Sequence, residues 1–180
     1  MLDGRPETLI DEGYRARRED RLPEAQRHFA DAVALCRKGK DEALLAQALT
    51  GMGQIARDLN DSSRALCCYE EAVRIHRGLD QPLRLAHTIR HVGDILRGMG
   101  RKVEAAPHYV EALELYRGHD ETAPLDLANT LRGYALPKED NGAFAEAIQL
   151  WQEAGRLYAQ LDVVAGVAES NARIARLSAR

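Results

Sequence analysis

The residues of this 180-residue chain best suited to chemistry include two adjacent cysteines. Cys67 and Cys68 precede His76 in the stretch ALCCYEEAVRIHRG, and Cys36 is the third cysteine. A zinc site needs cysteines spaced as C-x-x-C or a comparable cluster nearby. Neighbouring cysteines also cannot form the disulfide framework of a small secreted domain. The cysteines therefore favour reduced thiols that pack as small apolar side chains.

A second candidate is the segment HTIRHVGD, which places His87, His91 and Asp94 at i, i+4 and i+7. On a helix these three residues share one face, and two histidines with a carboxylate suit zinc or iron. No other segment offers an obvious fourth ligand. A polar helix face with titratable histidines is the favoured interpretation, and metal binding is the alternative. We predict neither a metal nor a cofactor.

Catalysis and several classes of partner are disfavoured. The sequence contains no nucleophile elbow, glycine-rich phosphate loop or pair of catalytic carboxylates, so we expect no enzyme. A net charge of −3 gives no general attraction to nucleic acid. The longest uncharged run, residues 43–56, is shorter than the about 20 apolar residues that cross a bilayer. Without the apolar core of a signal peptide, the sequence predicts a cytoplasmic protein with no membrane or nucleic-acid partner.

The stretch around the cysteines recurs along the chain. Four segments share small, aromatic and small positions at spacings of four and three. The aromatic positions are Phe29, Tyr69, Tyr109 and Trp151. The flanking small positions are Ala25, Ala65, Ala105 and Ala147, then Ala32, Ala72, Ala112 and Ala154. This spacing marks one face of an α-helix. The cysteines do not recur, which again favours packing over a metal site.

A second helix precedes each of these segments. Its aligned small residues, 40, 40, 42 and 40 positions apart, are Gly13, Gly53, Gly93, Ala135 and Ala175. Seven residues after the first four come residues that tolerate a left-handed backbone: Asp20, Asn60, Gly100 and Gly142. The loops between copies contain candidate Asp and Thr caps. The repeating unit is therefore a helix, a tight turn, a second helix and a short loop.

These aligned small and aromatic residues resemble the tetratricopeptide repeats. The period exceeds the family's usual length of about 34 and is similar to the forty-residue variety of kinesin light chain. The resemblance implies an all-α fold, a right-handed superhelical solenoid of antiparallel helix hairpins with about four and a half repeats. We expect a single domain over 1–180, with units at roughly 5–39, 40–79, 80–121 and 122–161 and a terminal capping helix at 162–178.

Local details lead to further expectations. Glycine at the crossing lets two helices approach, so a larger side chain at Gly53 or Gly93 should destabilise the fold by about 1–3 kcal/mol. Pro137 should kink or end its helix. Gly155 could make room for Trp151. On the last helix and just after it, Glu169, Asn171, Arg173, Arg176 and Arg180 would solvate the end of the array, or the same helix would pair two molecules.

In the resembled family, a concave groove lined by the first helix of each unit binds peptides. Here the corresponding positions carry Arg17, Arg57 and Arg97 at steps of 40, with further arginines near the middle. The predicted groove residues are Tyr14, Arg17, Gln54, Arg57, His87, Arg90, Asp94, Arg97, Asn129 and Arg132. The Lys and Asn pattern of chaperone-binding members is absent.

The sequence thus predicts a non-catalytic adaptor that binds an acidic peptide or helix of a partner protein, because repeated arginines can pair with carboxylates. A solvated arginine face is the simpler interpretation of the same residues. The alternative function is self-association into a homo-oligomer, such as a homodimer, through the ends of the solenoid.

Overall fold

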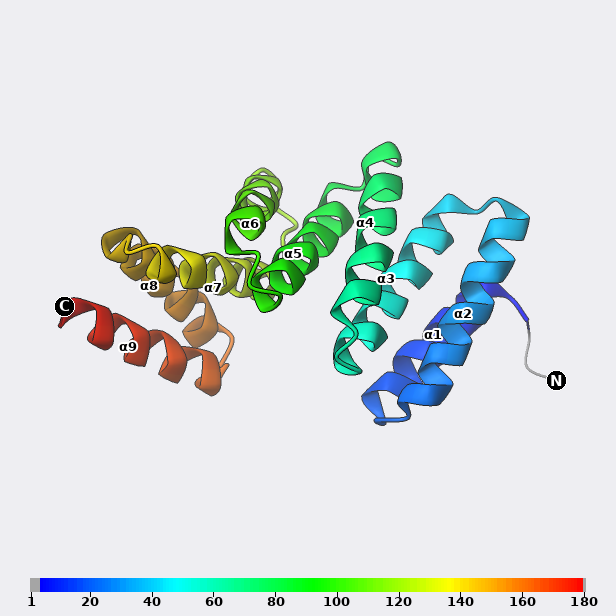
Figure 1. Ribbon diagram of the computed structural model, residues 1–180, viewed down its shortest axis with the longest axis horizontal. Coiled ribbons are helices and arrows are strands. Elements are labelled where there is room, and N and C mark those ends of the chain that lie inside the picture. Colours follow the sequence, from blue (N-terminus) through cyan, green and yellow to red (C-terminus); the bar gives the residue numbers. More distant parts are fainter. Residues whose placement is uncertain (1–3, 180) are drawn as a thin grey trace. The chain divides into compact units, whose positions relative to one another are not determined.

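The computed structural model describes residues 4–179, which contain nine α-helices and no strand (Figure 1). The helices are α1 (Pro6–Arg18), α2 (Leu22–Gly39), α3 (Glu42–Asp58), α4 (Ser62–Gly78), α5 (Pro82–Gly98), α6 (Lys102–Arg117), α7 (Pro124–Asp140), α8 (Phe144–Gln160) and α9 (Val164–Ser178). The all-α repeat fold is confirmed.

Helices that follow one another in sequence pack together. In the first half, α1 packs on α2, α2 on α3, and α3 on α4. In the second half, α6 packs on α7, α7 on α8, and α8 on α9. The chain forms two compact units that divide within α5, between Thr88 and Ile89. Each unit is described by itself, and the single domain expected over 1–180 stays a prediction.

An aromatic side chain of the second helix fills the space left by glycine in the first. A Cβ atom added to Gly13 of α1 would lie 2.8 Å from Cζ of Phe29 on α2. One added to Gly53 would lie 2.7 Å from Cε1 of Tyr69, and one added to Gly93 would lie 3.1 Å from Cε1 of Tyr109. The predicted close approach is confirmed, and its partner is an aromatic ring.

The same rings also contact a glycine on the following first helix. A Cβ atom on Gly51 of α3 would lie 2.2 Å from Cε1 of Phe29. A Cβ atom on Gly133 of α7 would lie 2.5 Å from Cε1 of Tyr109. Phe29 and Tyr109 are buried in this position. Each ring therefore joins three helices, and any side chain at these glycines forces the ring to move.

The predicted turns and part of the predicted capping are present. The residues predicted to end helices in a left-handed conformation have positive φ: Asp20 (58°), Asn60 (61°), Gly100 (78°) and Gly142 (75°). Asp41 and Asp61 each accept a hydrogen bond of 3.0 Å at a helix start, from the N–H groups of Leu44 and Arg64. These contacts satisfy backbone donors that the helix leaves free.

The structure corrects two expectations about the fourth repeat. α7 does not end at the buried Pro137 but continues to Asp140, so the predicted helix end is wrong and the alternative, a kink, stays a prediction. At Gly155, the nearest neighbour of an added Cβ is Ser170 Cβ of α9, at 3.1 Å, and not the Trp151 indole. Gly155 therefore allows α9 to pack closely on α8.

The cysteines take different positions, and none forms a disulfide. Cys36 and Cys68 are buried, whereas Cys67 is exposed. Burial raises the pKa of the Cys36 and Cys68 thiols, which favours the protonated form. The two buried cysteines thus behave as small apolar residues, as expected.

We predict that Gly51→Ala destabilises the protein by about 1–3 kcal/mol, because the new methyl group overlaps the Phe29 ring. Gly78→Ala, at the end of α4, is the matched control because a Cβ atom there meets nothing within 4 Å. Urea denaturation should show a lower midpoint for the first variant and an unchanged or higher one for the second. Equal midpoints for both variants would contradict the observed crossing.

A second prediction concerns the buried His76, whose Nδ1 donates a 3.0 Å hydrogen bond to Gln81 Oε1. Burial lowers its pKa from 6.5, with a smaller opposing effect of Gln81. Below that value the unfolded chain gains a proton that the folded chain resists, so stability falls by at most about 1.4 kcal/mol per pH unit.

Thermal melts between about pH 7.5 and 5.5 should show this loss in the wild type and less of it in His76→Gln. His119→Gln, at an exposed histidine, should behave as the wild type. A wild-type slope that survives in His76→Gln would assign the effect to other groups.

Candidate binding face of the first helices

The predicted groove residues all lie on first helices, but they divide between the two compact units. The first unit holds Tyr14, Arg17, Gln54, Arg57 and His87, and the second holds Arg90, Asp94, Arg97, Asn129 and Arg132. We call the second set, together with Glu139 of α7 and Glu169, Arg173 and Arg176 of α9, the α5–α9 face.

In the first unit, two predicted arginines share one carboxylate. Arg17 Nε on α1 donates to Oδ2 of Asp58 on α3 at 2.6 Å. Arg57 Nη2 lies 3.4 Å from Oδ1 of the same residue. About a third of each arginine side chain stays exposed. The basic positions at steps of 40 are therefore partly neutralised from within the fold.

Tyr14 lies beside this cluster and packs edge-on against Phe29, with 5.0 Å between ring centroids. Burial raises the pKa of its hydroxyl, and nearby Arg84 and Arg17 oppose that shift. Gln54 and His87 are half-buried. Tyr14 therefore contributes mainly to the core between α1 and α2.

In the second unit, Asp94 is the centre of a polar cluster on α5 and α6. It accepts hydrogen bonds from Arg90 Nη1 at 3.0 Å and from the Tyr109 hydroxyl at 2.8 Å. His91 Nε2 accepts from Arg90 Nη2 at 3.2 Å, so that ring nitrogen carries no proton. Arg90 is 8% exposed. Because it is so deeply buried, Arg90 mainly holds this cluster together.

Tyr109 links this cluster to Arg97. Burial and the adjacent Asp94 carboxylate raise the pKa of the Tyr109 hydroxyl far above its usual value, and a hydrogen bond from Arg97 opposes them. The Nε atoms of Arg90 and Arg97 are buried, and neither has an acceptor among residues 4–179. The cluster thus contains more guanidinium donors than acceptors.

Arg132 on α7 is the most exposed predicted arginine of this unit, with 41% of its side chain accessible. Its Nε donates to Glu169 Oε2 of α9 at 2.7 Å. This bond raises the arginine pKa, and Asp94 contributes a smaller effect in the same direction. Asn129, one turn earlier, accepts a 2.8 Å hydrogen bond from the Tyr158 hydroxyl. Arg132 keeps free donors toward solvent, whereas the Asn129 side-chain oxygen is engaged in the fold.

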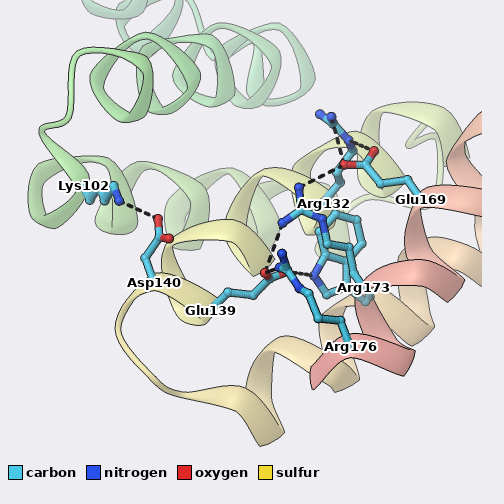
Figure 2. A network of polar contacts seen from close by, with 8 residues as sticks. Lys102, Arg132, Glu139, Asp140, Glu169, Arg173 and Arg176 are labelled. Atoms are coloured by element: carbon cyan, nitrogen blue, oxygen red, sulfur yellow. Dashed lines mark hydrogen bonds and ion pairs between the residues drawn. The ribbon is translucent and has the colours of Figure 1, made fainter. Parts of the chain in front are cut away.

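A second polar cluster joins α7, α8 and α9 (Figure 2). Glu139, whose side chain is 7% exposed, accepts hydrogen bonds from Trp151 Nε1, Arg176 and Arg173, the last at 3.1 Å. The Arg173 guanidinium also lies over the Trp151 ring, 5.7 Å from its centroid. Three donors neutralise this buried carboxylate, so Glu139 fixes α9 against α7 and α8.

Ion pairs add to the role expected of the last helix. Glu169, Arg173 and Arg176, which the sequence analysis expects to solvate the end of the array, also pair with Arg132 and Glu139 of α7. The Arg176 side chain is still 52% exposed, and Asn171 is exposed without such a pair among the described residues. Arg180 lies outside the described residues.

Sequence reasoning identified the arginines and Asp94, the partner of Arg90, but not the acidic partners Asp58 and Glu169. Glu169 could have been found, because it lies 40 positions after Asn129 and so occupies a groove position on the last helix. Asp58 follows Arg57 directly, and of the equivalent positions in the other repeats only Asp140 is acidic. The spacing of residues within one helix does not reveal which side chains of the neighbouring helix they contact.

Metal chemistry and membrane insertion gain no support from the structure. No three His, Cys, Asp or Glu residues gather around a potential ion site within residues 4–179. His91 Nδ1 lies 3.8 Å from Asp94 Oδ2, which is already bonded to Arg90. None of the described helices has both the length and the apolar composition needed to span a bilayer.

Comparison with known proteins links the chain to one repeat family. A tetratricopeptide repeat model matches residues 13–78. No curated protein matches the sequence. Among solved structures, BtubC (BKLC) from P. vanneervenii superposes with a TM-score of 0.77 at 20% identity, covering 87% of this chain and 66% of BtubC.

Two further structures share the fold at low identity. The apo form of RapI gives a TM-score of 0.82 at 13% identity, over 94% of this chain and 61% of RapI. Aspartyl phosphate phosphatase F from Bacillus subtilis gives a TM-score of 0.81 at 12% identity, over 92% of this chain and 43% of the phosphatase. The chain thus spans just under two thirds of the length of the first of these relatives, and less of the others. The sequence match identifies residues 13–78 as tetratricopeptide repeats, and the solved structures show that the chain shares their helical-repeat fold.

Proposed function

We propose that the chain is a non-catalytic adaptor whose α5–α9 face binds an acidic peptide or helix of a partner protein. The tetratricopeptide-repeat fold generally serves protein–protein interaction. The observation that supports an acidic partner is an excess of arginine over carboxylate on this face. Four arginines, Arg90, Arg132, Arg173 and Arg176, bond to the three carboxylates of Asp94, Glu139 and Glu169. Arg97 adds a fifth guanidinium, whose buried Nε has no acceptor among residues 4–179.

The internal ion pairs limit which arginines can bind a partner. A guanidinium has five N–H donors, and Arg132 uses only its Nε and Nη2 groups toward Glu169. Its remaining N–H groups can donate to a ligand carboxylate without breaking the internal pair. Arg90 is too deeply buried for this role. Arg132 and Arg176, whose side chains are 41% and 52% exposed, are the residues that we assign to the partner.

The internal carboxylates also limit affinity. A partner carboxylate that approaches Arg132 is repelled by Glu169 and Asp94, and ordering a flexible peptide costs further free energy. We therefore expect modest affinity that weakens with salt, because the charges involved are partly exposed. The same arrangement favours a helix with spaced acidic residues over a continuous acidic run.

Arg132→Gln tests this function. We predict that the variant binds acidic helical peptides about fivefold more weakly than the wild type, the equivalent of about 1 kcal/mol for a partly exposed charge pair. The probes are helical peptides of one length that range from acidic to basic, and fluorescence anisotropy reports binding.

Arg156→Gln is the matched control, because Arg156 is an exposed arginine on α8 and has no ion partner among the described residues. It should bind as the wild type does, and circular dichroism should show all three proteins folded at the assay temperature. Equal affinity of the wild type and Arg132→Gln for acidic peptides would refute the assignment of this face.

Self-association through the last helix is the second candidate function, and the exposure of α9 favours it. Ala175 aligns with Gly13, Gly53, Gly93 and Ala135, all of which are buried, but Ala175 is exposed. Val164 on the same helix is 78% exposed.

Light scattering tests this alternative. A dimer that Ala175→Glu converts to a monomer would support self-association. A wild-type monomer at all accessible concentrations would exclude it and leave the adaptor function.

A further inference from the structure

An ion pair between consecutive second helices recurs with the repeat. Arg37 Nη2 near the end of α2 contacts both carboxylate oxygens of Glu71 on α4, each at 2.9 Å. Two repeats later, Arg117 Nη2 at the end of α6 donates to Glu153 Oε2 of α8 at 2.7 Å. The arginines lie 80 residues apart and the glutamates 82. Each acid therefore receives an arginine from the preceding second helix.

Asp31 occupies the position of this acid on α2, 40 residues before Glu71. It is exposed and has no ion partner within residues 4–179. Its two counterparts each bind an arginine. Asp31 is thus a carboxylate in the register of a repeated ion pair, and the described part of the chain supplies no cation to it.

A cleft lies beside Asp31 between α1 and α2, and we call it the leading cleft. Leu9, Ala34 and Leu35 supply its apolar lining, and Arg27 and His28 border it. Leu35 is 36% exposed. The cleft therefore places aliphatic side chains next to an unpaired acid.

The equivalent aliphatic positions in later repeats are covered by a second helix. Leu49 and Ile75, 40 residues after Leu9 and Leu35, pack in one core with Val33 of α2. Leu157 packs with Leu113 of α6 in the same way. The leading cleft therefore has the lining of one half of a repeat interface, and no second helix among residues 4–179 covers it.

The two complete interfaces specify that helix. The covering helix carries an aliphatic residue, Val33 or Leu113, and an arginine four positions later, Arg37 or Arg117. In a helix, residues four positions apart lie on the same face. A helix with this pair can cover Leu35 and reach Asp31 together.

One position distinguishes the leading cleft from the internal interfaces. Asp11 lies 40 residues before Gly51, which makes room for the aromatic ring of Phe29. Asp11 is an exposed carboxylate in place of this glycine. On a helix that covers the leading cleft, the position four residues before the aliphatic residue should therefore carry a basic side chain and not an aromatic one.

We propose that the leading cleft binds an amphipathic basic helix of a partner protein, with an aliphatic residue between two basic residues at spacings of four. This surface lies in the first unit, takes a partner of opposite charge to that of the α5–α9 face, and does not depend on the proposed function. Apolar burial on the exposed Ala34 and Leu35 supplies the attraction, and Asp31 fixes the register of the helix.

The probe is a labelled peptide with the α2 sequence Leu22–Lys40 that carries Phe29→Lys and Cys36→Ser. It retains Val33 and Arg37, and the lysine prevents it from replacing α2 within the fold. Fluorescence anisotropy should show saturable binding to the wild-type protein. Binding to Asp31→Lys should be at least about fivefold weaker, and Leu35→Glu should abolish it. A peptide with Arg37→Glu should regain affinity for Asp31→Lys.

Glu71→Lys is the matched control, because Glu71 is the same acid one repeat later and already pairs with Arg37. It should bind the probe as the wild type does once its fold is verified by circular dichroism. Equal affinity of the wild type and Asp31→Lys, or no binding to the wild type, would overturn the proposal. A protein dimer that dissociates on Asp31→Lys would assign the cleft to a second copy and also overturn it.

Discussion

The fold of each unit depends on aromatic rings that occupy the space of missing side chains. Phe29 lies between Gly13 and Gly51, and Tyr109 lies between Gly93 and Gly133. Because one ring contacts two consecutive first helices, it sets both the hairpin crossing and the stacking of the next repeat. At the last repeat Arg173 takes the place of the second glycine, and its guanidinium lies over Trp151. The stacking contact is kept there, and a charge is added.

This arrangement brings the polar faces of consecutive first helices close enough to form ion pairs. Arg17 meets Asp58, and Arg132 meets Glu169. The arginines that would attract an acidic partner are therefore also part of the fold, and exposure separates their roles. Buried Arg90 maintains structure, whereas Arg132 can do both. The opposite charge preference that we propose for the leading cleft follows from the same periodicity, because Asp31 repeats an acid whose partner lies on the second helix of the preceding repeat.

The sequence predicted those features that repeat. Residue types at fixed spacing predict the repeat period, the helix hairpins and four left-handed turn residues. These residues are Asp20, Asn60, Gly100 and Gly142. Lys40 also has positive φ, 58°, although lysine carries no preference that would reveal it. Gly51 and Gly133 were not singled out because His91 stands between them in the alignment. The carboxylates that neutralise the face, Asp58 and Glu169, depend on contacts between helices, which a spacing along one helix does not specify.

A double-mutant cycle between Gly51 and Phe29 tests the central packing contact most directly. Unfolding free energies of Gly51→Ala, Phe29→Leu and the double variant, measured by urea denaturation, give the coupling between the two sites. If the ring occupies the glycine's space, the smaller leucine accommodates the new methyl group. The double variant should then be more stable than the sum of the single changes predicts, by about 0.5–3 kcal/mol. Additive effects would show that the two residues do not compete for one space and would contradict the account.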